Sequence, residues 1–299
     1  MQWLIETGAM EKLNQYWQLL ESSSAPPLGV KSVSEIEFIE LKKMVDSNDE
    51  DGIKSLISAM YEGTGWILRN AALPELRSVM LELAHEYSRK TESSFYKMLN
   101  GCPNFHRVIS DEITKNYSLY AIKHSFYFYN WNINSNLEKK FKDLVYEHWR
   151  YVKFISGNSL TKYENNIPSD GQIDRLQIIN YPQGGGQLRE HEDPRKNQRV
   201  VSGLIMSKIG VDFQRGGFYF RTSEEGKLNL ESRLNIGDSV MFYGSIAHGV
   251  DPVDDHLPLN WSLDVGRWFI GMFVNDSDHV EDRVTGVDMS GSTNFLSKG

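Results

Sequence analysis

The sequence predicts an α+β protein with a mainly helical first half and a β-rich second half. From the start of the chain to Ile155, apolar side chains recur at helical spacing over several long segments. From Asp174 onward, short runs of apolar, β-branched and aromatic residues alternate with turns. No helical crossover separates these runs, so their pairing is expected to be mostly antiparallel, in a barrel or a sandwich.

The helical segments are found by their apolar period and their end signals. We expect helices over residues 10–23, 32–45, 52–65, 73–90 and 137–155, with short strands over residues 65–70 and 124–131. For the second segment, Ser34 is the expected N-cap, because Glu37 follows three residues later in a capping-box pattern.

The β-rich half contains five strand-like runs between turn residues. They are residues 175–181, 199–207, 216–222, 239–245 and 267–274. We expect one catalytic domain over residues 1–299. Within it, residues 1–150 would form a mainly helical support region with an early core strand, residues 151–275 the β core with the site, and residues 276–299 a polar extension.

Composition excludes several classes of protein. The 299 residues carry a net charge of −8 with no long basic run, so we expect no nucleic-acid partner. The single cysteine, Cys102, excludes an intrachain disulfide. No apolar run is long enough to span a bilayer and the first residues do not have the pattern of a secretory signal. We therefore expect a cytoplasmic protein with no membrane partner.

The stretch HEDPR, which follows the glycine run 184–186, is the first candidate site. In a β-strand, His191 and Asp193 would point to the same side, and an imidazole with a carboxylate suggests a metal site. The third ligand we expect is His248, much later in the chain, at the end of the apolar run MFYGS. Two histidines and one carboxylate form the set that binds iron(II) in non-haem oxygenases.

Beyond these residues, the second half resembles the Fe(II)/2-oxoglutarate-dependent oxygenase superfamily. The segments RLQIINYPQGGGQLREHED, QRVVSGLIMS, GGFYF, NIGDSVMFYGSIAHGVDPV and GRWFIGMFV follow one another in the order of that family's core strands. The early segment GTGWILRNAALPELRSVMLELA also resembles the family's first strand and support helix. The resemblance implies a double-stranded β-helix, or jelly roll, whose two sheets close around the metal.

The resemblance also implies roles for individual residues. His191, Asp193 and His248 would be the catalytic iron ligands. Arg267, at the start of the last strand, would pair with the distal carboxylate of the co-substrate 2-oxoglutarate, for which a guanidinium fork is well suited.

Other arginines and two polar residues complete the candidate set. The interval from His248 to Arg267 is longer than the family pattern, so Arg199 and then Arg189 remain alternatives for the co-substrate. Gln177 and Tyr181 are expected to share a strand face with Ile179 and to contact the co-substrate.

The implied function is a dioxygenase that uses Fe(II), 2-oxoglutarate and O2. It would hydroxylate an unactivated C–H bond of a small metabolite while 2-oxoglutarate is decarboxylated to succinate. The presence of Asp193 favours hydroxylation, desaturation or ring closure over halogenation. The alternatives are a hydroxylase of protein or nucleic-acid side chains, and a non-catalytic jelly roll that binds a ligand or a metal. The sequence does not indicate the oligomeric state or the substrate.

Overall fold

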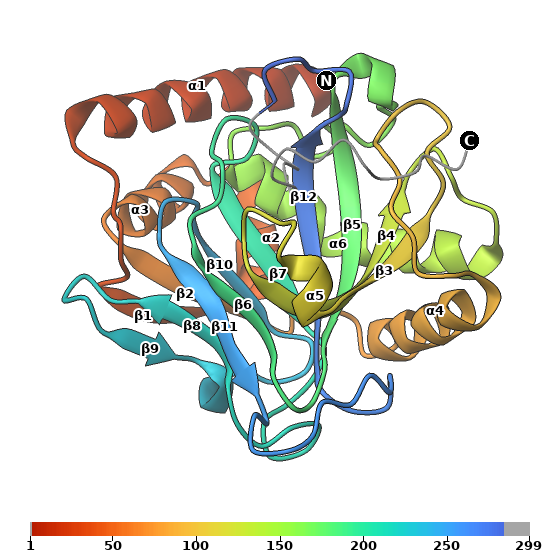
Figure 1. The fold of residues 1–299 in the computed structure, drawn as a ribbon. Coiled ribbons are helices and arrows are strands. Elements are labelled where there is room, and N and C mark those ends of the chain that lie inside the picture. Colours follow the sequence, from red (N-terminus) through yellow and green to blue (C-terminus); the bar gives the residue numbers. More distant parts are fainter. Residues whose placement is uncertain (1, 284–299) are drawn as a thin grey trace.

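The structure, a computed structural model, describes residues 2–283 and consists of two β-layers with helices packed outside them (Figure 1). The helices are α1 (Gln2–Ser23), α2 (Phe38–Asp46), α3 (Glu50–Tyr61), α4 (Leu76–Lys90), α5 (Asp111–Thr114) and α6 (Asn136–Ile155). The strands are β1 (Ser32–Glu37), β2 (Thr64–Arg69), β3 (Phe105–Ile109), β4 (Ala121–Tyr129), β5 (Gln172–Tyr181), β6 (Gly186–His191), β7 (Val200–Ile205), β8 (Gly217–Arg221), β9 (Lys227–Asn229), β10 (Ser239–Tyr243), β11 (His248–Val253) and β12 (Arg267–Asp276). Short 3-10 helices span Pro168–Asp170 and Glu231–Arg233.

The strands form one hydrogen-bonded path that curves back on itself. Its order is β1-β2-β10-β7-β12-β5-β4-β6-β11-β8-β9, with β3 on β4. The larger layer runs from β1 to β4, and the smaller layer of β6, β11, β8 and β9 lies in front of it in Figure 1. Strand β4 joins the layers, because Ala121 and Ile122 pair with β6 whereas residues 124–129 pair with β5. Every named pair except β1–β2 is antiparallel, which confirms the predicted jelly roll with helices packed on its sheet.

Alternating side chains of the larger layer supply two separate cores. On β7, Val200 and Leu204 face the helices, whereas Val201 and Ile205 face the smaller layer. A strand that is covered on both faces is expected to be mainly apolar, and β7 is buried along its whole length with Ser202 as its only polar side chain. The inner face of this layer is the wall on which the site is built.

Helix α6 is capped at its start and is fixed against the larger layer in its middle. Ser135 and Glu138 form a reciprocal capping box at its N-terminus, each side chain accepting a hydrogen bond from the other's backbone N–H at 3.1 Å. In its middle, the fully buried His148 places Nε2 2.9 Å from the hydroxyl of Ser202 on β7 and 3.2 Å from that of Ser239 on β10. The helix therefore holds two neighbouring strands of the wall.

The prediction of a helix over residues 32–45 is half wrong. Residues 32–37 form β1, a parallel edge strand on β2, and the helix begins only at Phe38. Ser34 is thus a strand residue and not an N-cap. Pairing with β2 and the ion pairs of Glu35 with Arg69 and Arg233 override the local capping signal. The segment 1–150 also contributes β3 and β4, so it supplies more of the sheet than one early strand.

Over residues 2–283, no helix combines the length with the apolar character that crossing a bilayer requires. The cytoplasmic location and the single catalytic domain stay predictions. Residues 284–299, which make up most of the predicted polar extension, lie outside the described residues.

We expect the stability of the protein to fall in mild acid because His148 is buried in its neutral form. Burial lowers its pKa from 6.5 to about 3, so below pH 6.5 the unfolded chain binds a proton that the folded chain excludes. This residue should therefore cost about 1.4 kcal/mol of unfolding free energy for each pH unit below 6.5 until the pH approaches 3. Urea unfolding at pH 7.0, 6.0 and 5.0 measures this slope.

The matched variants are His148→Gln, which removes the titrating group, and His256→Gln, which changes an exposed turn residue. The first should reduce the slope of the unfolding free energy against pH by about 1.4 kcal/mol per pH unit, and the second should leave the slope unchanged. Part of the slope should remain in both variants, because burial also lowers the pKa values of His124 and His191. Equal slopes for the protein and the His148→Gln variant would contradict the assignment.

Candidate metal centre

The approach of β6 to the site depends on the glycine turn that precedes it. Gly184 has φ +88°, and a Cβ on this residue would lie 2.3 Å from the carbonyl oxygen of Pro258. Only glycine fits this position, and the backbone N–H groups of Gly184 and Gly185 both donate to the carbonyl of Val253 at the end of β11. The run 184–186 is therefore a tight turn, and it ties the start of β6 to the end of β11.

The register of β6 and β11 brings the two histidines together. His191, the last residue of β6, is directly opposite His248, the first residue of β11. Residues that face each other in an antiparallel pair have neighbouring side chains, and the two imidazole centroids are 4.3 Å apart. We expected His248 at the end of the preceding apolar strand. It instead opens a new strand, after a turn over residues 244–247.

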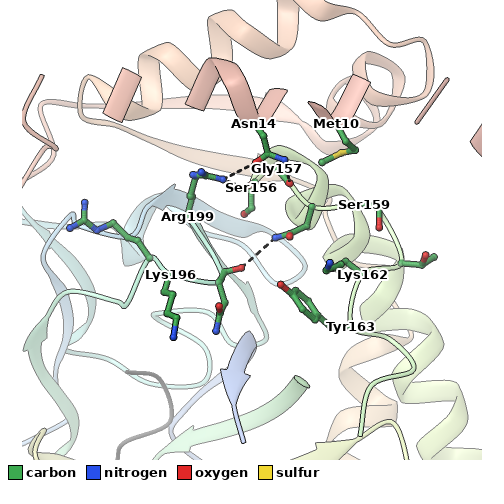
Figure 2. A pocket seen from close by; sticks show the side chains of 13 residues that line it. Met10, Asn14, Ser156, Gly157, Ser159, Lys162, Tyr163, Lys196 and Arg199 are labelled. Carbon is green, nitrogen blue, oxygen red and sulfur yellow. Dashed lines mark hydrogen bonds between the residues drawn. The ribbon is translucent and has the colours of Figure 1, made fainter. Parts of the chain in front are cut away.

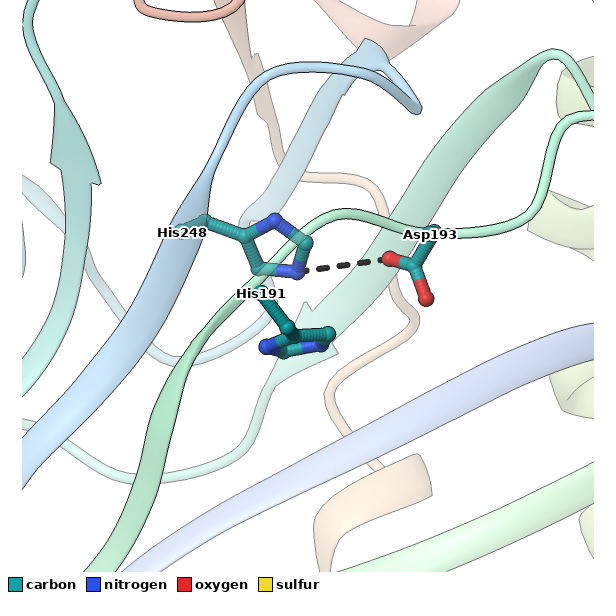
Figure 3. A group of neighbouring side chains, drawn as sticks. All are labelled: His191, Asp193 and His248. Carbon is teal, nitrogen blue, oxygen red and sulfur yellow. Dashed lines mark ion pairs between the residues drawn. The ribbon is translucent and has the colours of Figure 1, made fainter. Parts of the chain in front are cut away.

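Asp193 reaches the histidines from a loop and not from the strand. It lies two residues beyond the end of β6, so strand alternation does not orient it. Its backbone N–H donates to the carbonyl of Gly244 at 2.9 Å, which ties this loop to the turn before β11. Its Oδ2 lies 3.3 Å from Nε2 of His248 (Figure 3).

The three side chains form a compact donor set. One ligand atom from each of His191, Asp193 and His248 lies within 4.8 Å of those of the other two. Two imidazole nitrogens and one carboxylate oxygen at this separation can hold one divalent ion on one side and leave its other side open. The donor chemistry therefore fits iron(II).

Hydrogen bonds to the backbone fix the tautomer of both imidazoles. Nδ1 of His191 lies 3.0 Å from the carbonyl oxygen of Arg189, and Nδ1 of His248 lies 3.0 Å from that of Ile246. A carbonyl only accepts, so both Nδ1 atoms carry the proton. In the neutral rings, the lone pair is then on Nε2, the atom available to a metal.

The local electrostatics keep these ligands in their metal-binding forms. Burial lowers the pKa of His191 to about 4, and the charge of a protonated His248 would lower it further, so His191 is neutral at pH 7. Burial alone would raise the pKa of Asp193, but its pairing with a protonated His248 outweighs burial and lowers this pKa, so the carboxylate is ionised. A metal ion at Nε2 of His248 would take the place of that proton. A neutral imidazole and an ionised carboxylate are the forms that coordinate metals.

The three side chains line a cavity of about 440 Å³ between the two layers. Its walls are mainly apolar, with contributions from Ile179, Val201, Phe218, Phe242 and Phe269. Phe218 and Phe242 also pack against the ring of His248, with centroids at 5.9 and 4.6 Å. A volume of this size is typical of small-molecule sites.

Arg267 lines the same cavity and is almost completely buried. Its Nε donates to Oε1 of Glu231 at 2.5 Å, and its Nη2 has no hydrogen-bond partner within the described residues. Glu231 therefore compensates the charge of Arg267 and holds its orientation while part of the guanidinium fork remains unsatisfied. An unpaired buried donor is costly unless a ligand accepts from it.

Arg199 and Arg189, the two alternative arginines, do not line this cavity. Figure 2 shows Arg199 in a separate polar pocket beside α1, where it donates to Asn14 at 3.0 Å; it also forms an ion pair with Glu21 at 2.9 Å. Arg189 is exposed on β6 and lies over the ring of Tyr120. Arg267 is thus the candidate that shares the cavity with the triad.

Gln177 and Tyr181 lie on the inner face of β5 and line the cavity together with Ile179. Asn180 faces the other way and donates to the carbonyl of Val265. Tyr181 is paired in register with Arg267, and its ring lies 5.8 Å from that guanidinium.

Sequence reasoning missed two residues of this site. Glu231, in the second 3-10 helix, carries no motif that could have indicated its pairing with Arg267. Arg175 lines the cavity from β5, two residues before Gln177 on the same strand face. That spacing was a usable signal, because residues two apart on a strand share a face.

No family model and no curated protein matches this sequence. Among solved structures, the full-length T7H of Neurospora crassa in complex with alpha-KG and thymine aligns with a TM-score of 0.51 at 12% identity, over 83% of this chain and 86% of that one. Two other matches are a prolyl hydroxylase of Trichoplax adhaerens in complex with a hypoxia inducible factor peptide fragment (TM-score 0.44, 12% identity, 77% and 91% of the two chains) and a 2OG-Fe(II) oxygenase family oxidoreductase of Burkholderia pseudomallei (0.41, 10%, 74% and 90%).

The match to T7H covers most of both chains, so it concerns the whole architecture and not the strands of the site alone. The two histidines of the HxD…H pattern face each other across β6 and β11, and the aspartate joins them from the loop that follows β6. The chain therefore has the fold of the 2-oxoglutarate- and Fe(II)-dependent oxygenases, with a candidate His-Asp-His metal site in its cavity.

Proposed function

We propose that the protein is an Fe(II)- and 2-oxoglutarate-dependent dioxygenase that hydroxylates an unactivated C–H bond of a small metabolite. The observation that carries this proposal is one cavity that contains both a two-histidine, one-carboxylate donor set and a buried arginine whose Nη2 is unsatisfied within the described residues. His191, Asp193 and His248 would hold the metal, and Arg267 would bind the distal carboxylate of 2-oxoglutarate.

Bound iron and 2-oxoglutarate supply the oxidising chemistry, in which R–H, O2 and 2-oxoglutarate give R–OH, succinate and CO2. The chain's own residues would orient the metal and the co-substrate and enclose them in the cavity. The backbone carbonyls of Arg189 and Ile246 keep Nε2 of each imidazole available, and Glu231 fixes Arg267. The apolar walls exclude water, which strengthens the interaction of Arg267 with a carboxylate.

The size of the cavity favours a small metabolite over a macromolecular side chain as the substrate. About 440 Å³ between two sheets must accommodate both the co-substrate and the substrate. A non-catalytic module would need neither an open metal face nor an arginine beside it. Succinate formation from 2-oxoglutarate with Fe(II) and O2 tests this: we expect a measurable rate that chelation of the iron abolishes. No succinate under any loading would contradict the enzyme assignment.

Removing any one metal ligand should abolish turnover and weaken metal binding. His191→Ala, Asp193→Ala and His248→Ala each leave two donors. The affinity for Mn(II), a redox-stable substitute for Fe(II), should fall by more than the roughly 100-fold that loss of an outer-shell partner costs. Titration calorimetry under anaerobic conditions measures this affinity. His256→Gln is the control and should bind Mn(II) normally; an unchanged affinity in any of the three ligand variants would remove that residue from the site.

Arg267 and Arg199 give opposite expectations for 2-oxoglutarate. Arg267→Met should raise the KM for 2-oxoglutarate by about 10- to 100-fold, the value of a hydrogen bond to a charged group. Arg267→Lys keeps a cation beside Glu231, so its KM for 2-oxoglutarate should lie between those of the unmodified protein and Arg267→Met. Arg199→Met, in the separate pocket, should leave this KM unchanged. A raised KM in Arg199→Met with a normal KM in Arg267→Met would reverse the assignment.

A further inference from the structure

A second arginine lies at the opposite end of the cavity from Arg267. On β5, Tyr181 pairs with Arg267 of β12, and at the other end of the strand Arg175 pairs with Phe273 of β12. Arg175, Gln177, Ile179 and Tyr181 lie on the same face of the strand, and all four line the cavity. The strand from position 175 to position 181 spans about 20 Å, so the two guanidinium groups do not bind the same carboxylate.

Arg175 is buried without a counter-ion among residues 2–283. It is 8% exposed, and no carboxylate in that part of the chain forms an ion pair with its guanidinium. Its Nε is buried and likewise has no hydrogen-bond partner there. Asp278, which lines a small neighbouring pocket with Arg175, is ion-paired with Arg283 at 2.8 Å. Burial of an unpaired charge is costly, and an anionic ligand would remove that cost.

The guanidinium of Arg175 is nevertheless held in place. It lies 5.5 Å from the ring centroid of Tyr127 on β4 and 5.6 Å from that of Phe273 on β12. These cation–π contacts restrict the side chain without using its N–H donors. Asn275, two residues after Phe273, also lines this end of the cavity, and its buried Oδ1 has no partner among the residues described.

The charge balance of the cavity favours an anion. The carboxylates that line it are Asp193, which belongs to the metal site, and Glu192, which is exposed. Of the two arginines that line it, Arg267 is compensated by Glu231, whereas Arg175 has no carboxylate partner among residues 2–283. A buried charge without a partner in a cleft with apolar walls attracts ligands of the opposite sign.

We propose that Arg175 binds a carboxylate or phosphate group of the substrate, which makes the substrate class a small organic anion with an apolar body. The planar fork of a guanidinium matches both groups. This inference rests on the proposed function, because it assigns Arg267 to the co-substrate and Arg175 to the substrate. The separation of the two arginines would set the orientation of the substrate relative to the metal.

Matched pairs of an anion and a neutral analogue test the inference directly. The pairs are 3-phenylpropanoate with 3-phenylpropanamide and phenyl phosphate with phenol, titrated into protein saturated with Mn(II) and 2-oxoglutarate. In at least one pair, the anion should bind about tenfold or more tightly than its neutral analogue, as expected for a hydrogen bond to a charged group. The pair that shows the preference identifies the group as carboxylate or phosphate.

Variants show which residue causes the preference for the anion over its neutral analogue. Arg175→Met should reduce the affinity ratio within that pair to near one, and Arg175→Lys should retain part of it. The exposed Arg89→Met, in the last turn of α4 and away from the cavity, is the matched control and should retain the whole ratio. Equal affinities within both pairs in the unmodified protein, or an anion preference that persists in Arg175→Met, would overturn the inference. The affinities for Mn(II) and 2-oxoglutarate, measured on the same samples, test the proposed function separately. Loss of either affinity would count against the proposed function, whereas the anion pairs test only the role of Arg175.

Discussion

The pairing register between β6 and β11 is the constraint on which the site depends. His191 and His248 are opposite each other across this pair, so their imidazoles meet although the two residues are far apart along the chain. A slip of one residue would turn a side chain to the other face of its strand and separate the two rings. Both ends of the pair are fixed: the glycine turn holds the start of β6 to the end of β11, and the Asp193–Gly244 hydrogen bond holds the other end. The hydrogen bond that fixes this end of the register therefore also holds the carboxylate of Asp193 beside the two imidazoles.

The larger layer contributes a rigid wall with two distinct ends. Its central strands β10, β7, β12 and β5 are buried on both faces, with α6 on the outside and the cavity on the inside. Across the paired strands β5 and β12, one arginine is compensated by Glu231 and lies beside Tyr181, whereas the other is held between two aromatic rings and has no counter-ion in the described part of the chain. Because both strands are partners over their whole length, the spacing of these two charges is a property of the sheet and not of a loop. Such a wall can orient an elongated anion with little conformational cost.

Strands that are buried on both faces could be predicted from the sequence. Strands that form because a partner strand is available could not. Strands β7, β10 and β12 read as largely apolar runs, so they could be predicted. β5 is more polar, but it ends in the apolar stretch that contains Ile178 and Ile179. β11, with the sequence HGVDPV, and β9, with KLN, lack such runs and form only because partners are available. For the same reason the residues 32–37 were assigned to a helix. The identity of His191, Asp193 and His248 could be inferred from residue types, but Asp193 reaches the site through a loop contact that no alternation rule contains. Likewise, no sequence pattern distinguishes an arginine that has a carboxylate partner from one that lacks it.

The central claim is that three side chains brought together by one strand register bind a single metal ion inside the cavity. A crystal structure of the protein with Mn(II) and 2-oxoglutarate, with the metal located by anomalous diffraction, tests it most directly. The account predicts one manganese ion bonded to Nε2 of His191, Nε2 of His248 and the carboxylate of Asp193, with the distal carboxylate of 2-oxoglutarate on Arg267. Manganese bound at another position, or a cavity that remains without metal at saturating concentration, would contradict it.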